Sequence, residues 1–361
     1  MTQAGRVSAR LRHLPSDVAE LLQLGFGVID IATATRAGVD ESRLRRLAAA
    51  GLLVRFVPGC YAAADVLVAA SPWVEHALRS RAFALYSGEA TFLTGWSAAA
   101  TWQLPTIGPA PERVAAIRPN GAGHKVRRGP YGDIRIAAIP PGHARRFRGI
   151  GVMSPGWAVA DAARSGSIVP ALVAADAAAA AGHDPCCVVP AMAGWPGVAR
   201  ARWVADHADP CAESPLETLG RFTCLQFDLP LPVANAWVGD GRPEYRVDGL
   251  WPWHGAVFEA DGALKYDNRP DASRIVTRQG EREWRLRRLG LDVVRFGWDL
   301  AWRNRAELAA RFAALLRDNA RHQEPVRWWK QVPGVGAVEP GPDDWPSPRR
   351  TGIVLPAGWD R

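Results

Sequence analysis

Lysine is scarce in this sequence. Lys125, Lys265 and Lys330 are the only lysines among 44 basic residues, so almost all of the positive charge is carried by arginine. GC-rich coding favours arginine over lysine and accounts for most of this bias. A lysine that is present despite this bias therefore indicates a position where arginine cannot replace it.

Cysteines and long apolar runs are also few. The five cysteines form no C-x-x-C pair, and Cys186 and Cys187 are adjacent, which suits neither a zinc site nor an easy disulfide. The N-terminal residues lack the apolar core of a signal peptide. The Ala-rich run at 170–182 is too short to span a bilayer. We therefore expect a soluble cytoplasmic protein with no membrane association.

Length and composition predict a chain of several segments. The 361 residues allow two or three domains, and the net charge of +8 favours a polyanionic partner without proving one. Helical and strand patterns alternate, which predicts a mixed α/β (α+β) fold. We expect boundaries that give segments 1–66, 67–195 and 196–325, followed by a Pro/Gly-rich tail, 326–361, that is mostly irregular.

The first segment predicts two short helices and a hairpin. "IDIATATRAG" ends at a glycine, and Asp40 can cap a second helix, "ESRLRRLAAAG", that Gly51 can terminate. "LLVRFVPGCYA" contains two short β runs joined at Pro58-Gly59. Helix, turn, helix and hairpin together are the layout of a winged helix, whose second helix enters the major groove.

Four arginines of this segment are candidate DNA contacts. Arg43, Arg45 and Arg46 point outward from the second helix, and Arg55 lies on the hairpin. They can meet bases or phosphates. The alternative is that they form an ordinary solvated helix face.

The same segment resembles the N-terminal domain of AbiEi-family antitoxins. The matching residues are "GVIDIATATRAGV" followed by "LRRLAAAGLLVRFVPGCY". The resemblance implies a winged helix, DNA-linked regulation and a cognate toxin as partner. The middle segment resembles the second half of that architecture, for which we expect a scaffold or partner-binding role. Its basic run "HKVRR", residues 124–128, is interpreted as a loop at a hairpin tip or as a phosphate contact.

A cluster of acids interrupts two predicted strands of the third segment. "EYRVDG" and "GAVFEAD" flank "LWPWH". A hairpin centred near Trp253 and His254 places Asp248 opposite Glu259. Alternation then puts both acids, with Asp261, on the face opposite the apolar one. Opposed carboxylates repel unless a cation offsets them, and Mg²⁺ prefers such ligands together with water and phosphate oxygens.

Two further residues complete the predicted site. Lys265 follows Glu259 by six residues and could face a phosphate. Glu217 stands in the S-x-x-E start signal of a helix at "SPLET", where it is either a capping residue or a third acid aimed at the same metal. We expect Asp248, Glu259, Lys265 and Glu217 to be catalytic. The expected Mg²⁺ ligands are Asp248, Glu259 and Asp261.

The third segment resembles the PD-(D/E)XK nuclease superfamily, in particular its very-short-patch-repair (Vsr)-like branch. The resemblance rests on "SPLET", "YRVDG", "FEADG", "REWRLRRLG" and "LDVVRFGW", in the order α-β-β-β-α-β-α. It implies metal-dependent endonuclease activity. Asp261 stands where the superfamily has its lysine, and Gln279–Glu283 ("QGERE") departs from the E-K-x-R-E of antitoxin-fused relatives.

Three functions remain open on the sequence. The chain is a DNA-binding Mg²⁺-dependent endonuclease, or a non-catalytic repressor of a toxin-antitoxin system with a degenerate nuclease fold. The third is an interaction module that docks a partner through Trp328, Trp329 and Trp345 of the tail. Structural roles compete with the metal site, since Asp248 can bond loop amides and Glu259 can pair with Arg246 or Arg282.

Overall fold

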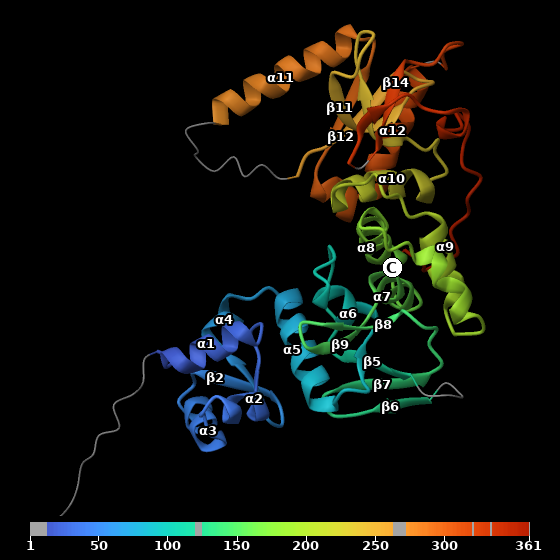
Figure 1. The fold of residues 1–361 in the computed structure, drawn as a ribbon. Helices are drawn as coiled ribbons and strands as arrows, with labels where there is room; N and C mark the ends of the chain where they lie inside the picture. The colour runs from blue at the N-terminus through green and yellow to red at the C-terminus, as the bar shows by residue number, and fades with distance from the viewer. Residues whose placement is uncertain (1–12, 120–124, 263–271, 320, 333, 361) are drawn as a thin grey trace, which may run out of the picture. The chain divides into compact units, whose positions relative to one another are not determined.

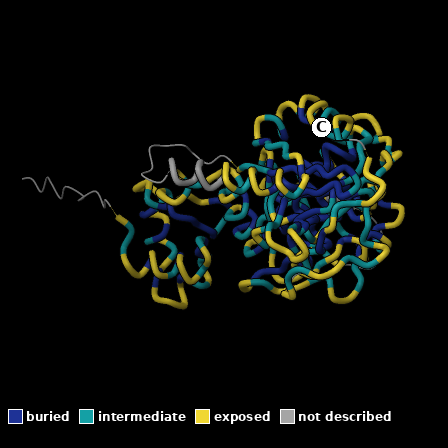
Figure 2. The backbone as a smooth tube through the Cα atoms, turned by 90° about the horizontal axis from the view of Figure 1, so that it is seen from above, coloured by how far each residue is buried: buried dark blue, intermediate teal, exposed yellow. Residues whose placement is uncertain are grey.

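The structure is a computed structural model with a mixed α/β fold, as the sequence predicts. It describes residues 13–119, 125–262, 272–319, 321–332 and 334–360 (Figure 1). The chain divides into two compact units. One comprises Met1–Arg164 with Pro185–Ala201, and the other Ser165–Asp184 with Arg202–Arg361. Buried residues gather along the interior strands and their covering helices (Figure 2).

The first unit opens with three helices and a small antiparallel sheet of order β1-β3-β2. Its elements are α1 (Ser16–Leu24), β1 (Ile29–Asp30), α2 (Ile31–Arg36), α3 (Glu41–Ala49), β2 (Leu53–Val57) and β3 (Cys60–Ala63). The predicted signals act as expected. Asp40 caps α3 by accepting the Arg43 N–H at 2.7 Å, and Gly51 and Gly59 adopt φ of 77° and 81°.

The hairpin shares a core with the next part of the chain. After α4 (Ala64–Ala69), helix α5 (Pro72–Ser87) starts at the Ser71 cap. Ala82 of α5 packs in one cluster with Phe56, Val57 and Cys60 of the hairpin. The three-helix segment and α5 are therefore built around continuous apolar packing.

A six-stranded sheet of order β6-β7-β5-β4-β9-β8 follows in the first unit. Its strands are β4 (Phe92–Leu93), β5 (Val114–Pro119), β6 (Lys125–Arg128), β7 (Gly132–Ala137), β8 (Ala144–Phe147) and β9 (Ile150–Met153). Helices α6 (Gly95–Thr101) and α7 (Pro155–Ala163) accompany it, with short turns η1 (Pro185–Cys187) and η2 (Val189–Met192), and α9 (Val198–Asp206) follows.

The interpretation of "HKVRR" as a loop is wrong over 125–128, because those residues form edge strand β6 against β7.

The second unit holds a mixed sheet of order β13-β12-β11-β10-β14-β15. Its strands are β10 (Val233–Val238), β11 (Tyr245–Trp251), β12 (Ala256–Ala260), β13 (Asp292–Phe296), β14 (Trp328–Val332) and β15 (Gly336–Val338). Its helices are α8 (Ile168–Ala180), α10 (Pro215–Gln226), α11 (Ala272–Arg288), the π-helix η3 (Asp299–Arg303), α12 (Arg305–Asp318) and the turn η4 (Pro342–Asp344). From α10 to α12 the elements follow the predicted order α-β-β-β-α-β-α.

Both faces of this sheet are covered. On one, Phe258, Phe296 and Phe312 pack within 5.7 Å between ring centroids, so that α12 is held to β12 and β13. Gly220 of α10 allows this closeness, since a Cβ there would lie 2.7 Å from the Phe296 ring. Leu286 of α11 belongs to a separate buried cluster with residues of β10 and β11.

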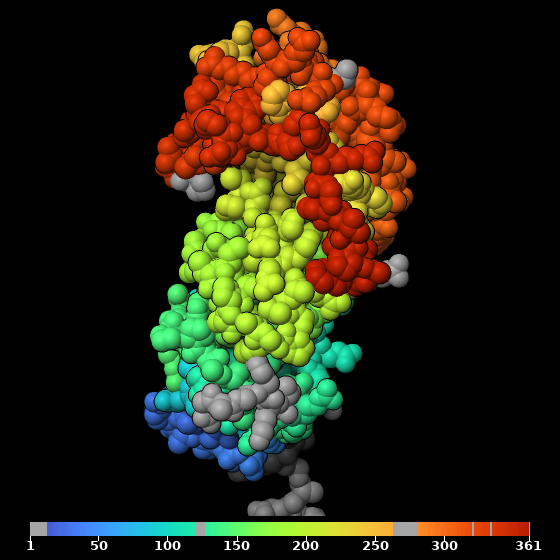
Figure 3. Space-filling view, turned by 90° about the vertical axis from the view of Figure 1, so that its right-hand side faces the viewer, coloured from blue at the N-terminus to red at the C-terminus, as the bar shows by residue number. Residues whose placement is uncertain are grey.

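The C-terminal tail contributes to the sheet, which the sequence did not predict. Trp328 and Trp329 of β14 are 1% and 5% exposed and pair with β10. They are therefore core residues and not a free docking surface, and the Trp345 ring packs edge-on against Trp328. The rest of the tail runs along the outside of the second unit (Figure 3), where Asp228 accepts the Gly352 N–H at 2.7 Å.

Within the described ranges, no helix has both the length and the apolar character needed to cross a bilayer.

Candidate functional site

The acidic hairpin has the predicted register. Gly249 pairs with Phe258, and Trp251 pairs with Ala256. Continuing this ladder by one residue places Asp248 opposite Glu259, on the same face of the sheet. The ladder opens at this point, because the Asp248 carboxylate accepts the backbone N–H of Ala260 through Oδ2 at 2.7 Å.

Glu217 lies in the first turn of α10, where it contacts the helix cap and also lies near the acids of the hairpin. The Ser214 hydroxyl caps the helix by accepting the Glu217 N–H at 3.2 Å. Glu217 Oε2 in turn accepts the Glu213 N–H at 2.9 Å, one residue before the cap. Burial raises the pKa of Glu217, and the Asp248 charge acts in the same direction. Glu217 is thus a capping residue that also belongs to the acidic site.

Asn235 of β10 is a site residue that the sequence analysis missed. Its Nδ2 donates to Glu217 Oε2 at 2.6 Å and to the Cys211 carbonyl at 2.7 Å. The side chain is 1% exposed, and its φ is 49°. A residue in the left-handed region interrupts the regular strand and turns its side chain towards α10. An asparagine inside an apolar strand, "LPVANAWV", is the signal that could have revealed it.

Glu259 is the most deeply buried acid of the hairpin, at 4% exposed. Burial raises its pKa to about 7, and Asp248 adds to the rise, although the Arg282 guanidinium opposes it. Arg282 Nη2 donates to Glu259 Oε1 at 2.9 Å and also to the Arg246 carbonyl. Burial raises the pKa of Asp248 too, and the Ala260 N–H and Arg282 act in the opposite direction.

Asp261, the third predicted metal ligand, acts on the pKa values of Asp248 and Glu259 but has an arginine partner of its own. It pairs with Arg295 of β13 at 3.2 Å, and the Arg295 Nε is 3.5 Å from Glu283. In the part of the chain that the structure describes, no group of three or more His, Cys, Asp or Glu side chains is placed to hold a metal ion. The structural alternatives for Asp248 and Glu259, a backbone amide and Arg282, are both present. Lys265 lies outside the described residues.

Two carboxylates remain suited to a hard cation. Asp248 Oδ1 and Glu259 Oε2 receive no hydrogen bond from a described residue, whereas Asp248 Oδ2 and Glu259 Oε1 are engaged. Mg²⁺ commonly binds through one or two carboxylates together with waters and phosphate oxygens. The residues present fit a two-carboxylate Mg²⁺ site at Asp248 and Glu259, whereas the predicted third ligand, Asp261, is paired with Arg295.

The four arginines of the N-terminal segment differ in their hydrogen-bond and ion-pair partners. Arg43 makes a two-pronged ion pair with Asp17 of α1, at 2.5 and 2.9 Å. Arg45 pairs with Glu41 one turn away, and Arg46 donates to the Ser42 hydroxyl at 3.0 Å. Arg55 of β2 is exposed and pairs with no acid among the described residues. Arg43 is thus already paired with an acid of α1, and the local sequence did not indicate this contact.

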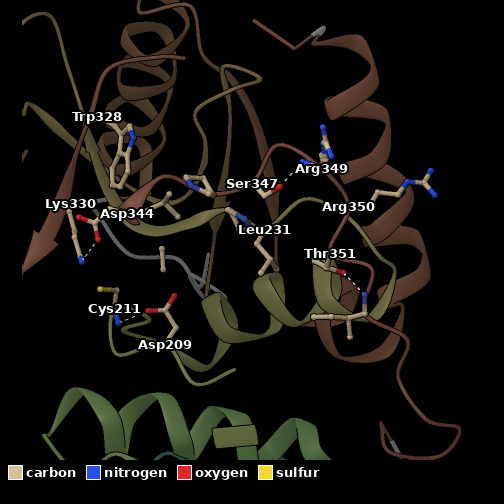
Figure 4. A pocket seen from close by; sticks show the side chains of 15 residues that line it. Asp209, Cys211, Leu231, Trp328, Lys330, Asp344, Ser347, Arg349, Arg350 and Thr351 are labelled. Carbon is tan, nitrogen blue, oxygen red and sulfur yellow. Dashed lines mark hydrogen bonds and ion pairs between the residues drawn. The ribbon is translucent and has the colours of Figure 1, made fainter. Parts of the chain in front are cut away.

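A cavity of about 520 Å³ opens in the second unit beside β10 and the tail (Figure 4). Leu231 and Trp328 form apolar parts of its wall, and Arg349 and Arg350 line it from the tail. Lys330 is paired with Asp344 at 2.5 Å at its edge. The Cys211 thiol also lines it, and burial raises its pKa to about 11. The sequence did not predict this cavity, because part of its wall is formed by the tail, which was expected to be irregular.

Comparison with known proteins adds little to this description. No protein-family model matches the sequence, and no curated protein matches it. Among solved structures, the chain is similar to the Rv2827c protein from Mycobacterium tuberculosis, with 19% sequence identity and a TM-score of 0.32. That match covers 55% of this chain and 78% of the other. At this TM-score the likeness does not extend to function.

Proposed function

We propose that the chain binds DNA through its N-terminal helices and hairpin, used as a winged helix. One observation carries this proposal. Helix α3 is capped by Asp40, buries Leu44 and Leu47, exposes Arg45 and Arg46, and is followed directly by the hairpin β2–β3. This is the element order in which a recognition helix enters the major groove and a hairpin touches the backbone.

The arginines differ in how readily they can bind DNA, because some of them already pair with an acid. Arg46 and Arg55 have no acid partner among the described residues, so phosphates can approach them without displacing one. The Arg45 pair with Glu41 is exposed at the helix surface, and such pairs contribute little and exchange readily. Arg43 would first have to leave Asp17. We therefore expect Arg45, Arg46 and Arg55 to contribute more than Arg43.

Titration of a mixed-sequence DNA duplex at several salt concentrations tests the proposal. Each lost phosphate contact reduces the slope of log K against log salt by roughly 1. Arg46→Ala and Arg55→Ala should each weaken binding and flatten this slope. Arg43→Ala, which removes the same charge from the same helix, is the matched control and should change the slope less. Equal slopes for all four proteins would refute the proposed interface.

A second function, Mg²⁺-dependent hydrolysis of DNA phosphodiesters, is favoured by the hairpin register. Asp248 and Glu259 would hold the ion through Asp248 Oδ1 and Glu259 Oε2. Bound Mg²⁺ would supply an activated water and neutralise charge on the phosphate. Asn235 and the Glu213 N–H fix the Glu217 carboxylate beside Asp248. Lys265, predicted to face the scissile phosphate, completes this set.

Plasmid nicking in Mg²⁺ separates the two functions. Hydrolysis requires that wild-type protein nick the plasmid, that Asp248→Asn abolish nicking, and that Glu281→Gln, an exposed acid on α11, leave it unchanged. Equal nicking by wild type and Asp248→Asn would rule out hydrolysis at the Asp248 site. DNA binding without nicking would support the repressor alone, for which a toxin encoded in the adjacent reading frame is the expected partner.

A further inference from the structure

A second cavity, in the first unit, combines apolar walls with positive charge. Its volume is about 390 Å³, and Leu78 of α5 and Leu104, just after α6, line it. Phe26, in the turn after α1, also lines it and is 46% exposed. Because Phe26 lines a cavity, its exposed surface is one that a ligand could cover. We refer to this cavity as the Phe26 pocket.

Two arginines converge on the Phe26 ring. The Arg81 and Arg148 guanidinium carbons lie 5.0 and 4.7 Å from its centroid. Arg81 Nε donates to the Gly25 carbonyl at 2.6 Å, and Arg148 also lies over Phe147 at 5.0 Å. Neither guanidinium pairs with an acid in the described part of the chain. The pocket therefore carries two positive charges that form no ion pair, although the Asp30 carboxylate acts on Arg81 from outside the pocket lining.

The backbone gives an independent reason to regard this pocket as a site. Several helices end with a residue in the left-handed region, whose following N–H bonds back into the last turn. Glycine occupies that position at the ends of α2, α3, α8 and α11, namely Gly38, Gly51, Gly182 and Gly290. Side chains occupy it after α1, α6 and α10, as Phe26, Gln103 and Asp228.

Two of these three exceptions line the same pocket. Asp228 has its own use, because it binds the tail at Gly352. Phe26 and Gln103 have φ of 53° and 60°, where glycine is favoured, and both side chains face the Phe26 pocket. Strained residues persist where surrounding structure or a ligand requires them. Because both side chains line one pocket, we infer that the pocket is the reason why these two positions are not glycine.

We propose that the Phe26 pocket binds a small amphipathic anion, a flat apolar body carrying one carboxylate, sulfonate or phosphate group. The apolar body would lie against Phe26, Leu78 and Leu104. The anionic group would meet Arg81 and Arg148, whose planar guanidinium groups suit oxyanions. The volume is that of a small-molecule site. A DNA phosphate would use the arginines but leave the apolar wall uncovered.

Paired dye titrations of the full chain test both halves of this proposal. The charged probe is 8-anilinonaphthalene-1-sulfonate, and N-phenyl-1-naphthylamine is its counterpart without the sulfonate. Arg81→Gln and Arg148→Gln should each weaken binding of the charged dye about tenfold, as expected for a charge-assisted contact. They should leave the uncharged dye almost unaffected. Arg146→Gln on the same hairpin and Arg349→Gln in the other cavity are controls that should change neither dye.

Replacing Phe26 by glycine separates a binding role from a structural one. Phe26→Gly removes the pocket wall but suits the left-handed backbone. It should weaken both dyes while the melting temperature stays the same or rises. The proposal is overturned if charged-dye binding survives Arg81→Gln, Arg148→Gln and Phe26→Gly, or if Arg349→Gln alone abolishes it. It is also overturned if the arginine variants weaken both dyes equally, which would indicate that the arginines shape the pocket and do not bind the anionic group.

Discussion

Replacing Glu259 by glutamine should make the protein more stable at alkaline pH. The carboxyl is 4% exposed, and burial raises its pKa from 4.5 to about 7 even with Arg282 beside it. Ionisation is therefore easier in the unfolded chain than in the folded protein. The stability linked to this group is fully present below pH 4.5 and is lost as pH rises through about 7.

The size of the effect follows from the two pKa values. They differ by about 2.5 pH units, and each unit corresponds to roughly 1.4 kcal/mol. Ionising Glu259 in the folded protein thus costs ~3 kcal/mol at pH 8. Glutamine has the same shape, keeps an oxygen that can accept from Arg282, and never ionises. We expect Glu259→Gln to match wild type at pH 4.5 and exceed it by up to ~3 kcal/mol at pH 8.

Urea unfolding at half-unit intervals from pH 4.5 to 8 measures this difference. Subtracting the wild-type curve from the variant curve cancels the buried histidines, such as His76, whose lowered pKa values give the opposite slope. Glu217 and Asp248 also have raised pKa values and leave a residual slope in the variant. Glu281→Gln is the control and should follow wild type. Parallel curves for wild type and Glu259→Gln would refute the account of a buried, ionising carboxylate.

Three further changes test other parts of the structure. Arg282→Gln should raise the pKa of Glu259 above about 7, because the guanidinium lowers it, and the same urea series should show the loss of stability continuing to higher pH and becoming larger. Asp40→Ala should lower the free energy of unfolding by about 1 kcal/mol through loss of the α3 cap, and no loss would show that the cap is redundant. Phe26→Gly relieves a left-handed residue worth about 1 kcal/mol. A thermal melt showing a lower melting temperature for the variant would mean that the Phe26 side chain stabilises the fold.

Local signals in the sequence predicted local structure well. The Asp40 cap and the glycine at position 51 depend only on neighbouring residues, and both are present. The hairpin register also followed from local spacing, because a tight turn near Trp253 fixes which residues face each other. These features share one property, which is that the deciding contacts lie within about a dozen residues along the chain.

Contacts between distant residues were predicted less well. Arg43 bonds Asp17 across 26 positions, a contact that was not predicted, whereas the Arg282 bond to Glu259 across 23 positions was one of two pairings that the sequence left open. No local pattern specifies such pairs, since an arginine on an exposed helix face can turn towards solvent or towards any nearby acid. Strand β6 was missed for a related reason. An edge strand can carry charged residues without losing its pairing, so its composition looks like that of a loop.

Two residues of the "QGERE" stretch, Arg282 and Glu283, join α11 to the sheet. Arg282 binds Glu259 of β12, and Glu283 lies within ion-pair distance of Arg295 of β13. These are the positions that hold α11 to the sheet, whereas Gly280 is exposed. The arginine also supplies the positive charge that opposed carboxylates require when no metal is bound. A chain with this arrangement can keep its acidic hairpin folded whether or not it hydrolyses DNA, so stability cannot report on catalysis and the nicking assay must decide it.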